Sequence, residues 1–355
     1  MTINEREIAL NALLSYRRNG AWPDLYLKEA LEKADSKKAS LVSAITYGVL
    51  QNQNLIDYYI SCFSSLKMNK ISPLVLESLR IGAYQILFLE KIPLSAAVNE
   101  SVKLVSKTGN RRASGFANGL LRRLGAEKNN LPEIKAQTFE EYLSIKYSHP
   151  LWLVKKYISV FGSQEAEDIL KHDNMPAMPA IRVNTLKNSC PEFEAEANKV
   201  SADILEKVSC CPDAYYVHDL GALIKSPLFE RGCFYVQDVA SQQAIIALNP
   251  KKGSRLLDIC AAPGGKSLLA CQLMENDGYI LANDLYPHKA KLIKKNAEGY
   301  GAGIIHTSCF DASEYDESLS ESFDYIICDV PCSGLGIIRK KPDIRFKSPD
   351  ELEAL

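Results

Sequence analysis

The chain has 355 residues and a formal net charge of −1, and 46% of its residues are hydrophobic and 24% are charged. This composition is typical of a globular protein, and the length predicts two or three domains. No apolar run approaches the roughly 20 residues of a membrane span, and the N-terminus lacks the basic region and apolar core of a secretory signal. These features predict a cytoplasmic protein with no membrane partner.

The ten cysteines are predicted to be free thiols rather than a disulfide framework, because no secretory signal precedes them. Cys210 and Cys211 are adjacent and Cys328 and Cys332 are four positions apart, so no C-x-x-C pair occurs. We therefore expect no structural zinc site and no other metal.

Charge is distributed unevenly along the chain. Residues 1–130 contain 18 Lys and Arg against 11 Asp and Glu, whereas the remaining residues contain 24 against 32. A basic segment joined to an acidic one indicates that the first segment meets a polyanion. A solvated basic face without a partner is the alternative.

Residues 4–125 are predicted to be helical throughout, because apolar residues recur at three- and four-residue spacing. The expected helices are 4–18, 37–63, 72–89, 93–109 and 113–125, with Asn110-Arg111-Arg112 as a basic turn before the last helix. Ser72 is the expected N-cap of the third helix, and Pro73 its first residue. The basic residues gathered in one region of this sequence are Lys103, Lys107, Arg111, Arg112, Arg122 and Arg123.

PLSAAVNESVKLVSK followed by SGFANGLLRRL resembles the C-terminal half of the NusB-like RNA-binding fold. The resemblance implies that the first domain contacts RNA. Residues 126–148 are polar and predicted to be a linker with some helix, after which a helix begins near Leu151. His149 and His172 are expected to be surface or capping residues rather than metal ligands.

The middle of the chain predicts a small α/β insert. AIRVNTLK, residues 180–187, is an expected strand, and residues 190–235 are expected to hold a helix near 192–206 and strands near 214–218 and 233–237.

From residue 235 onward, strands and helices alternate, which predicts a parallel, doubly wound sheet. A helix over 238–248 precedes expected strands at 255–260, 278–284, 303–311 and 323–332. In such sheets, ligands bind at the carboxyl ends of the strands. The residues predicted to meet at these ends are the loop 260–266, Asp284, Asp311, Asp329 and Cys332.

The segment RLLDICAAPGGK combines a buried strand, a glycine turn and a helix that begins at about Lys266. It is not a phosphate-binding P-loop, because Cys260 stands where the first glycine is required, and it lacks the G-x-G-x-x-G dinucleotide pattern. A nucleoside ligand without a phosphate chain remains, and S-adenosylmethionine fits that description. A strand–helix turn with no ligand is the alternative.

Three acids could complete such a site. Asp284 follows the glycine loop by about 20 residues and can accept both ribose hydroxyls. Asp311 follows the third strand, where an acid can bond the amine of adenine. Asp258 lies inside the first strand and either reaches the methionine amino group or satisfies buried backbone donors.

The loop after the fourth strand contains Cys332 between Pro331 and Ser333, three residues after Asp329. A cysteine held in such a loop beside an acid is a candidate reactive thiol. The positive charges that follow, and that suit a nucleic-acid backbone, are Arg339, Lys340, Lys341 and Arg345.

These parts support one reaction. A thiolate that adds to carbon 6 of cytosine makes carbon 5 able to accept a methyl group, while an acid interacts with ring nitrogen 3. A base then removes the proton from carbon 5 and the thiol is expelled.

DICAAPGGKS, NDLYPHK, CFDAS and CDVPCSGLGIIRKKPDIRF together resemble the NOL1/NOP2/Sun family of RNA cytosine-5 methyltransferases. With the NusB-like segment in front, the resemblance is to the RsmB (Sun) branch, which methylates 16S ribosomal RNA. It implies that S-adenosylmethionine contacts Cys260, Ala261, Ala262, Pro263, Gly264, Gly265, Lys266, Asp284, Asp311 and Asp329. It also implies three domains: a NusB-like bundle at 1–128, a linker with an RNA-recognition-like α/β subdomain at 129–235, and a Rossmann-like methyltransferase domain at 236–355.

One part of the family pattern is absent. The resemblance assigns Cys332 to product release and places the attacking cysteine in a Thr-Cys-Ser/Thr motif on a later strand. The chain ends at Leu355, within an expected helix SPDELEAL, and Cys309 and Cys328 are expected to lie in the core. We therefore expect a chain truncated at its C-terminus, with weak cofactor binding and no methyl transfer.

Other functions remain open from the sequence. The alternatives are a methyltransferase acting on transfer RNA or on protein, and a non-catalytic RNA-binding or assembly factor that keeps the methyltransferase fold as a scaffold.

Overall fold

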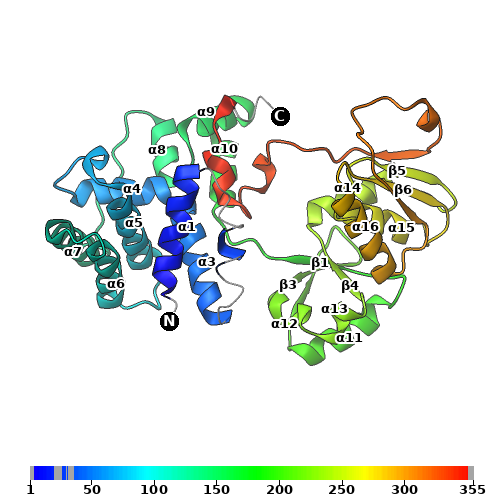
Figure 1. Cartoon of the computed structure of the whole chain (residues 1–355), viewed down its shortest axis with the longest axis horizontal. Helices are drawn as coiled ribbons and strands as arrows, with labels where there is room; N and C mark the ends of the chain where they lie inside the picture. The colour runs from blue at the N-terminus through cyan, green and yellow to red at the C-terminus, as the bar shows by residue number, and fades with distance from the viewer. Residues whose placement is uncertain (1–3, 20–25, 29, 31–35, 351–355) are drawn as a thin grey trace. The chain divides into compact units, whose positions relative to one another are not determined.

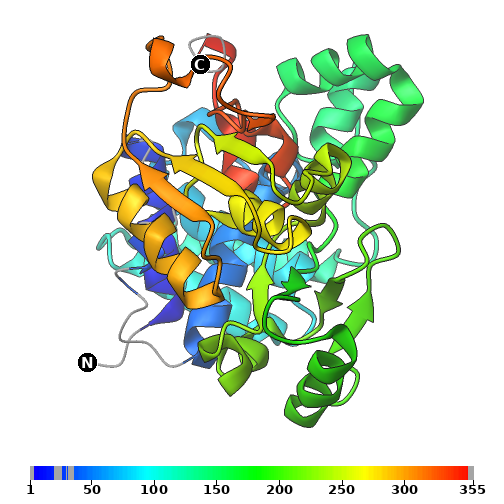
Figure 2. The same ribbon diagram turned by 90° about the vertical axis from the view of Figure 1, so that its right-hand side faces the viewer.

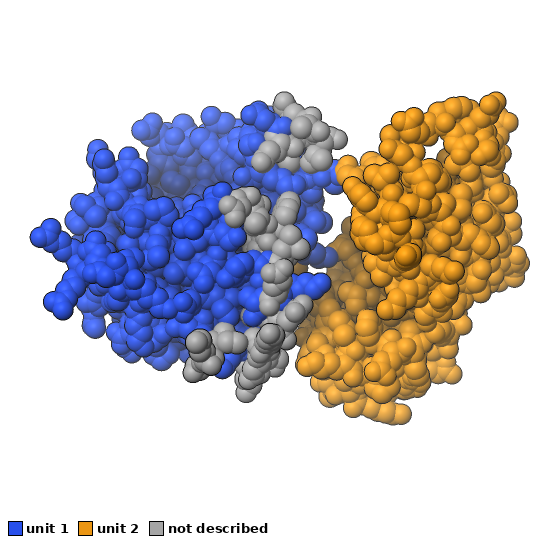
Figure 3. Space-filling view, viewed as in Figure 1, with its two compact units in different colours: residues 1–176, 332–355 blue, residues 177–331 orange. Residues whose placement is uncertain are grey.

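The computed structural model describes residues 4–19, 26–28, 30 and 36–350. The chain forms two compact units: residues 1–176 together with 332–355, and residues 177–331 (Figure 3). This division differs from the three predicted domains, whose bounds stay a prediction. The expected helix at the C-terminus extends into residues 351–355, which lie outside the described residues.

The first unit is helical, and its helices are drawn in blue to green in Figure 1. They are α1 (Glu5–Asn19), α3 (Ser36–Gln51), α4 (Gln53–Phe63), α5 (Pro73–Phe88), α6 (Leu94–Ser106), α7 (Arg111–Ala126), α8 (Phe139–Lys146), α9 (Leu151–Phe161) and α10 (Ser163–Asp173). Short 3-10 turns lie at Met68–Lys70, Leu335–Ile337 and Pro342–Phe346.

Helix α5 is the centre of this bundle and packs against α1, α3, α4, α6 and α7. Its sequence is apolar around most of its circumference, which is the pattern of a helix buried on all sides. Gly82 permits the close approach of α7, because a Cβ atom there would lie 2.6 Å from the Leu121 side chain.

Helix α5 also buries charge. Glu77 is fully buried and Arg80 is 4% exposed. Arg80 binds Asp57 of α4 through two hydrogen bonds of 2.6 and 2.5 Å, and its third nitrogen lies 2.6 Å from Glu77. Arg17 of α1 pairs with Glu77 as well. This cluster, Arg17–Asp57–Glu77–Arg80, therefore satisfies most of its charge with protein partners.

The segment after residue 331 returns to the helical unit. Ile338 and Ile344 pack with Leu153 of α9 in a small apolar cluster. The guanidinium of Arg345, fully buried, donates to the carbonyl oxygens of Gln51 at 3.0 Å and Ser148 at 2.9 Å. These contacts fasten the segment to the turns that follow α3 and α8.

The second unit contains two four-stranded sheets (Figures 1 and 2). Its strands are β1 (Ala180–Val183), β2 (Leu205–Lys207), β3 (Ala214–Val217), β4 (Phe234–Val236), β5 (Arg255–Asp258), β6 (Tyr279–Asn283), β7 (Ile305–Ser308) and β8 (Tyr325–Ile327). Its helices are α11 (Cys190–Val200), α12 (Leu220–Ile224), α13 (Pro227–Glu230), α14 (Val239–Leu248), α15 (Gly265–Leu273) and α16 (Pro287–Tyr300), with a 3-10 turn at Glu317–Leu319.

The first sheet has the order β2-β3-β1-β4, and all of its pairs are antiparallel. The second has the order β7-β6-β5-β8, and all of its pairs are parallel. An all-α bundle followed by an α/β domain with a small α/β insert is the predicted fold class, and it is confirmed.

The parallel sheet reverses its winding at β5. Strands β6 and β7 follow on one side of β5, with Leu256 opposite Ile280, whereas β8 lies on the other side, with Leu256 opposite Tyr325. Ligands in doubly wound sheets bind at this switch point, outside the carboxyl ends of the strands. The fold therefore predicts a site where β5 and β8 end.

Two local predictions were wrong. Asn110 is the N-cap of α7 and accepts from the backbone NH of Ala113, so Arg111 and Arg112 lie in the first helical turn rather than in a loop. The helix expected to reach residue 206 ends at Val200, because Ser201 is extended and Asp203 adopts a positive φ of 53°. Strand β2 then begins at Leu205, a short strand that the apolar pattern did not indicate.

Candidate functional site

The glycine loop joins β5 to α15 through two glycines with different roles. Gly264 is the N-cap of α15 and has φ of +104°, a left-handed conformation that other residues rarely adopt. A Cβ atom on Gly265 would lie 3.0 Å from the ring of Tyr235. The loop is closed by a bond of 2.6 Å from the NH of Gly264 to the oxygen of Ala261. The backbone path thus favours glycine at 264, and the close contact with Tyr235 favours it at 265.

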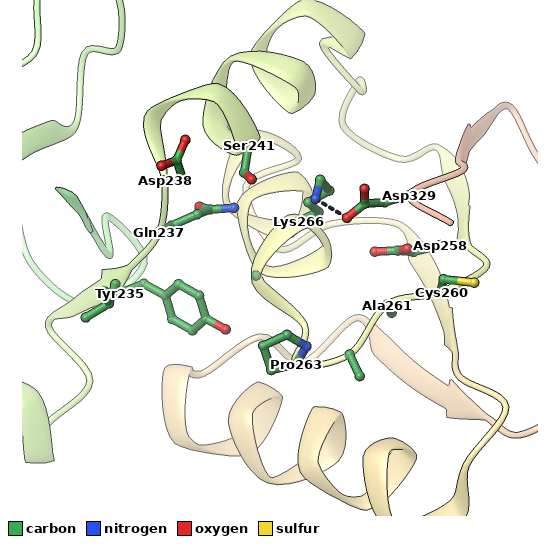
Figure 4. A pocket seen from close by; sticks show the side chains of 13 residues that line it. Tyr235, Gln237, Asp238, Ser241, Asp258, Cys260, Ala261, Pro263, Lys266 and Asp329 are labelled. Atoms are coloured by element: carbon green, nitrogen blue, oxygen red, sulfur yellow. Dashed lines mark hydrogen bonds and ion pairs between the residues drawn. The ribbon is translucent and has the colours of Figure 1, made fainter. Parts of the chain in front are cut away.

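A pocket of about 210 Å³ opens at the switch point (Figure 4). Its walls are the glycine loop, the end of β5, Asp329 two residues after the end of β8, and the segment that joins β4 to α14. The lining residues are Tyr235, Val236, Gln237, Asp238, Ser241, Asp258, Cys260, Ala261, Ala262, Pro263, Gly265, Lys266 and Asp329.

Asp258 is the buried acid of this pocket, with 1% of its surface exposed. One carboxylate oxygen accepts from the hydroxyl of Ser267 at 2.7 Å, and the other has no hydrogen-bond partner among the described residues. Burial raises the pKa of Asp258 to about 6. A buried carboxylate with a free oxygen at a pocket wall is suited to a donor from a ligand.

Lys266 and Asp329 form an ion pair across the pocket mouth, between the start of α15 and the chain after β8 (Figure 4). The side chain of Lys266 is 20% exposed and that of Asp329 is 55% exposed. The pair therefore lies at the solvent edge, where its charges remain available to a ligand.

Asp284 and Asp311 lie near this edge but not in the pocket wall. Asp284 is buried just after β6 and accepts from the backbone NH of Tyr286 at 3.2 Å. Asp311 is exposed after β7, where its carboxylate accepts from the NH and hydroxyl of Ser313. These hydrogen bonds lower the pKa of Asp311. Both acids keep their predicted ligand roles as proposals.

Asn283 was not predicted, yet it ties three strand ends together. Its fully buried amide donates to the oxygens of Ile259 at 3.1 Å and Phe310 at 3.0 Å. Its oxygen accepts from the hydroxyl of Ser308 at 3.1 Å. The only feature of the sequence that could have indicated this role is the position of Asn283 directly before Asp284, the expected partner of the ribose.

The wall formed by residues 235–241 was also missed. Gln237 is held by a hydrogen bond of 2.9 Å from the buried guanidinium of Arg182. Asp238 caps α14 by accepting from the NH of Ala240. A strand end followed by a helix N-cap is a common site position, and that pattern could have indicated this wall.

All ten cysteines are free, as predicted. Cys332 is exposed in an irregular segment, as are Cys309 and Cys328. The expectation that Cys309 and Cys328 lie in the core was wrong, because β7 ends at Ser308 and β8 at Ile327, so both residues follow their strands. Among the described residues, no group of His, Cys, Asp and Glu could hold a metal ion.

The six basic residues of α6 and α7 are all exposed. Lys103 and Lys107 are paired with Glu100 and Glu7 at 2.5 Å. The residues do not form one cluster, because Arg111 and Arg122 are about 16 Å apart along α7 at 1.5 Å per residue. Their RNA contacts stay a prediction.

Arg345 does not fit its predicted role. Its side chain is fully buried, and both of its terminal nitrogens donate to protein oxygens, among them Asn174 Oδ1 at 3.2 Å, whereas its Nε has no partner among the described residues. Because the side chain is buried, it cannot meet a phosphate in this structure. Arg339 donates to the carbonyl oxygens of Met175 and Pro176. Lys340 and Lys341 are exposed. The four basic residues are neighbours in the sequence, but Arg345 is fully buried and the other three are not.

His149 was expected on the surface and is instead fully buried beside Asp173, at 3.4 Å. Burial lowers the pKa of His149. Within the described part of the chain, no helix has the length and apolar content to cross a membrane.

Three family models match the chain. They describe the NusB family over residues 3–126, the N-terminal domain of 16S rRNA methyltransferase RsmF over 150–239, and 16S rRNA methyltransferase RsmB/F over 245–354.

Curated relatives match over nearly the whole chain. A probable ribosomal RNA small subunit methyltransferase B from Bacillus subtilis is 36% identical over 351 residues, which cover 98% of this chain and 77% of the relative. A ribosomal RNA small subunit methyltransferase B from Klebsiella pneumoniae is 27% identical and covers 98% and 79%.

Solved structures share the fold. The crystal structure of PH0851 has a TM-score of 0.72 at 24% identity and covers 100% of this chain and 80% of that one. The structure of NSun6 from Pyrococcus horikoshii with SFG has a TM-score of 0.51 at 21% identity and covers 58% and 76%. From its match to the Bacillus relative, the chain belongs to the ribosomal RNA small subunit methyltransferase B family of RNA methyltransferases.

Proposed function

We propose that the protein methylates carbon 5 of a cytosine in 16S ribosomal RNA, through a covalent cysteine–cytosine adduct. The observation that carries the proposal is the pocket at the switch point, where the glycine loop, Asp258 and the Lys266–Asp329 pair meet. Membership of an RNA methyltransferase family supports the reaction class.

S-adenosylmethionine is the cofactor of this methyltransferase, and it supplies an electrophilic methyl group when bound. The residues present fit it. Asp258 lines the pocket and has one oxygen without a partner among the described residues, which suits an ammonium group, and Gly265 lines the pocket at the start of α15. The volume of about 210 Å³ is below the roughly 300 Å³ of small ligand sites, so the pocket suits the amino-acid end alone.

The other contacts that we propose, with the rest of the cofactor and with cytosine, follow from the positions of residues after the strands of the parallel sheet. The segment Cys260 to Lys266 offers backbone NH groups, and Asp284 after β6 is the proposed partner of the ribose hydroxyls. Asp311 after β7 is the proposed partner of the adenine amine. Asp329 lines the cofactor pocket and precedes Cys332 by three residues in the chain, so its carboxylate is the proposed partner of ring nitrogen 3 of cytosine.

The thiol chemistry has two parts. A thiolate forms a bond to carbon 6 of cytosine, which makes carbon 5 nucleophilic. After methylation, a base removes the proton from carbon 5 and the bond between sulfur and carbon 6 breaks. The resemblance assigns release of the product to Cys332, which is exposed.

The test measures cofactor binding by calorimetry and methyl transfer from tritiated S-adenosylmethionine. We expect the natural protein to bind S-adenosylmethionine and to transfer the tritiated methyl group to carbon 5 of cytosine in 16S ribosomal RNA. Failure to bind the cofactor would favour a non-catalytic RNA-binding factor. Transfer to transfer RNA but not to 16S RNA would contradict the proposed substrate.

A further inference from the structure

A second hollow, of about 750 Å³, lies entirely within the helical unit, between α9 and the segment that follows Cys332. Its volume is in the range of roughly 300–1,000 Å³ that small-molecule sites occupy. The lining residues that carry the argument are Trp152, Lys155, Lys156, Ser159, Ser333 and Leu335.

The α9 residues of this hollow share one helix face. Trp152, Lys155, Lys156 and Ser159 occupy positions i, i+3, i+4 and i+7, which lie above one another on a helix. The neighbouring residues Leu153 and Val154 are fully buried and hold α9 to its unit. The helix therefore presents an aromatic ring, two ammonium groups and a hydroxyl together.

The positive charges of the two lysines on this face have few negatively charged neighbours. Lys155 and Lys156 are exposed, and neither forms an ion pair with another described residue. Glu140 interacts with Lys155 only at longer range, and its pKa is lowered mainly by hydrogen bonds at the start of α8. Trp152 is half-buried and packs on the cluster of Leu153, Ile338 and Ile344. Its ring is held in place while part of it remains exposed.

The opposite wall belongs to the loop of the candidate thiol. Ser333 lines the hollow and directly follows Cys332. Leu335 packs on the same apolar cluster as Trp152, and the buried Arg345 fastens the segment further along. A ligand in the hollow would therefore contact Ser333, the residue that follows Cys332 in the chain.

We propose that this hollow binds a single-stranded RNA nucleotide, with its base stacked on Trp152 and its phosphates paired with Lys155 and Lys156. The inference rests on the proposed function and adds a place in the helical unit where single-stranded RNA is held. Unpaired bases stack on aromatic side chains, and lysines neutralise the backbone, whereas a duplex hides its base faces. The Ser333 hydroxyl, which accepts from the NH of Leu335, can donate to a ribose or phosphate oxygen, whereas the Ser159 hydroxyl donates to the oxygen of Lys156 and can only accept from a ribose hydroxyl.

The experiment measures fluorescence anisotropy of a labelled oligocytidylate of five nucleotides with the full chain, over a series of salt concentrations. Trp152→Leu should weaken binding about tenfold, because the stacking partner is lost, and Trp152→Phe should keep most of the affinity. Lys155→Ala/Lys156→Ala should reduce the slope of log affinity against log salt by about 1.4, from two phosphate contacts on a single strand.

A matched control is Lys294→Ala/Lys295→Ala, which removes an adjacent exposed pair from α16 in the other unit. An equal change of slope in this control would overturn the proposal, because binding would then follow net charge alone. Equal loss with Trp152→Phe and Trp152→Leu would also overturn it. Competition by polyglutamate as strong as by unlabelled RNA would show an acidic peptide site instead.

Two readouts separate this proposal from the proposed function. S-adenosylmethionine binding, measured by calorimetry, should be unchanged in all three variants of α9. RNA carrying 5-iodocytidine should crosslink on irradiation to the peptide that contains Trp152, whether or not the cofactor is bound. Crosslinks elsewhere and none to α9 would contradict the hollow while leaving the methyltransferase assignment intact.

Discussion

Two groups of charged residues in this protein have similar chemistry but opposite surroundings. The Arg17–Asp57–Glu77–Arg80 cluster lies in the helical unit, where Arg80 uses all three of its nitrogens on protein carboxylates. The Asp258–Lys266–Asp329 group lines an open pocket, where Asp258 keeps an oxygen with no partner among the described residues and Asp329 is half exposed.

The difference separates a structural role from a ligand-binding one. In the first cluster one oxygen of Glu77 has no hydrogen-bond partner among the described residues, but every member faces an opposite charge, so the cost of burial is offset only while every member is present. In the pocket group, the free-energy cost of burying the Asp258 carboxylate is only partly offset until a ligand supplies a hydrogen-bond donor. Substitutions in the two groups should therefore affect stability and cofactor binding in opposite proportions.

The largest loss of stability is expected from Arg80→Leu. It leaves Glu77 buried next to Asp57 with less compensation, which should cost about 3–5 kcal/mol in the free energy of unfolding. Urea denaturation followed by circular dichroism measures this. Glu77→Gln/Arg80→Leu is the control and should recover part of the loss, since the buried charge is removed. A cost below about 1 kcal/mol for Arg80→Leu would mean that the cluster is not closed.

Arg345→Leu should come next. It leaves the buried carbonyls of Gln51 and Ser148 without a donor, at a cost of about 1–3 kcal/mol for each unsatisfied group. Hydrogen exchange should rise over residues 332–350 before it rises in α5. Arg339→Leu, on the same segment but partly exposed, is the matched control and should have the smaller effect. Similar hydrogen exchange in both variants would contradict the role of Arg345 in fastening residues 332–350 to the helical unit.

Asp258→Asn should change stability in the other direction. Because burial raises the pKa of Asp258 to about 6, the folded state loses stability as the pH rises from the unfolded value of 3.8 toward 6. The ionised form costs up to about 3 kcal/mol above that range, and asparagine removes this cost. Thermal unfolding at pH 5 and pH 8 should show the larger stabilisation at pH 8, since only about half of the cost is present at pH 5.

The same residue links pH to cofactor affinity. If the carboxylate receives the ammonium group of S-adenosylmethionine, affinity should fall about tenfold from pH 7 to pH 5 as Asp258 becomes protonated. Calorimetry at the two pH values tests this, and Asp258→Asn should bind weakly at both. An affinity that stays constant over this range would rule out Asp258 as the partner.

The smallest effect on stability is expected from Lys266→Met and Asp329→Asn. An ion pair at the solvent edge contributes little, so the free energy of unfolding should change by less than about 1 kcal/mol. Cofactor affinity should nevertheless fall about tenfold, since a charge-assisted contact is lost. Lys252→Met, which removes a lysine paired with Glu275 at the surface, should change neither quantity. Loss of stability without loss of affinity would assign the pair to the fold.

Much of the site was predictable because it is local in sequence. The strand, the glycine turn and the start of α15 are contiguous, and hydrophobic periodicity with two glycines predicts them. Acids after successive strands were predicted to share an edge, since parallel strands end on the same side. The roles of Asn283 and Gln237 could not be predicted, because their partners lie on other strands and on Arg182.

Burial of charged residues was the main failure of prediction. Arg345 follows Arg339, Lys340 and Lys341, and a run of positive charge is usually a solvated surface. Its environment depends on the oxygens of Gln51 and Ser148, roughly 300 and 200 residues away in the chain. His149 was misplaced for the same reason, since Asp173 lies on another helix.

The amino-acid sequence by itself determined the helical and α/β halves, the glycine loop and the family, because these depend on periodicity and on contiguous motifs. Only the tertiary structure decided which charged side chains are enclosed by protein partners and which line a pocket. It placed Asp329 opposite Lys266 and Ser333 opposite Trp152, since neighbours across strand ends and helix faces are set by packing. Asp258 and Glu77 each have a carboxylate oxygen without a partner among the described residues, but only Asp258 lines a pocket, and long-range packing decides that difference.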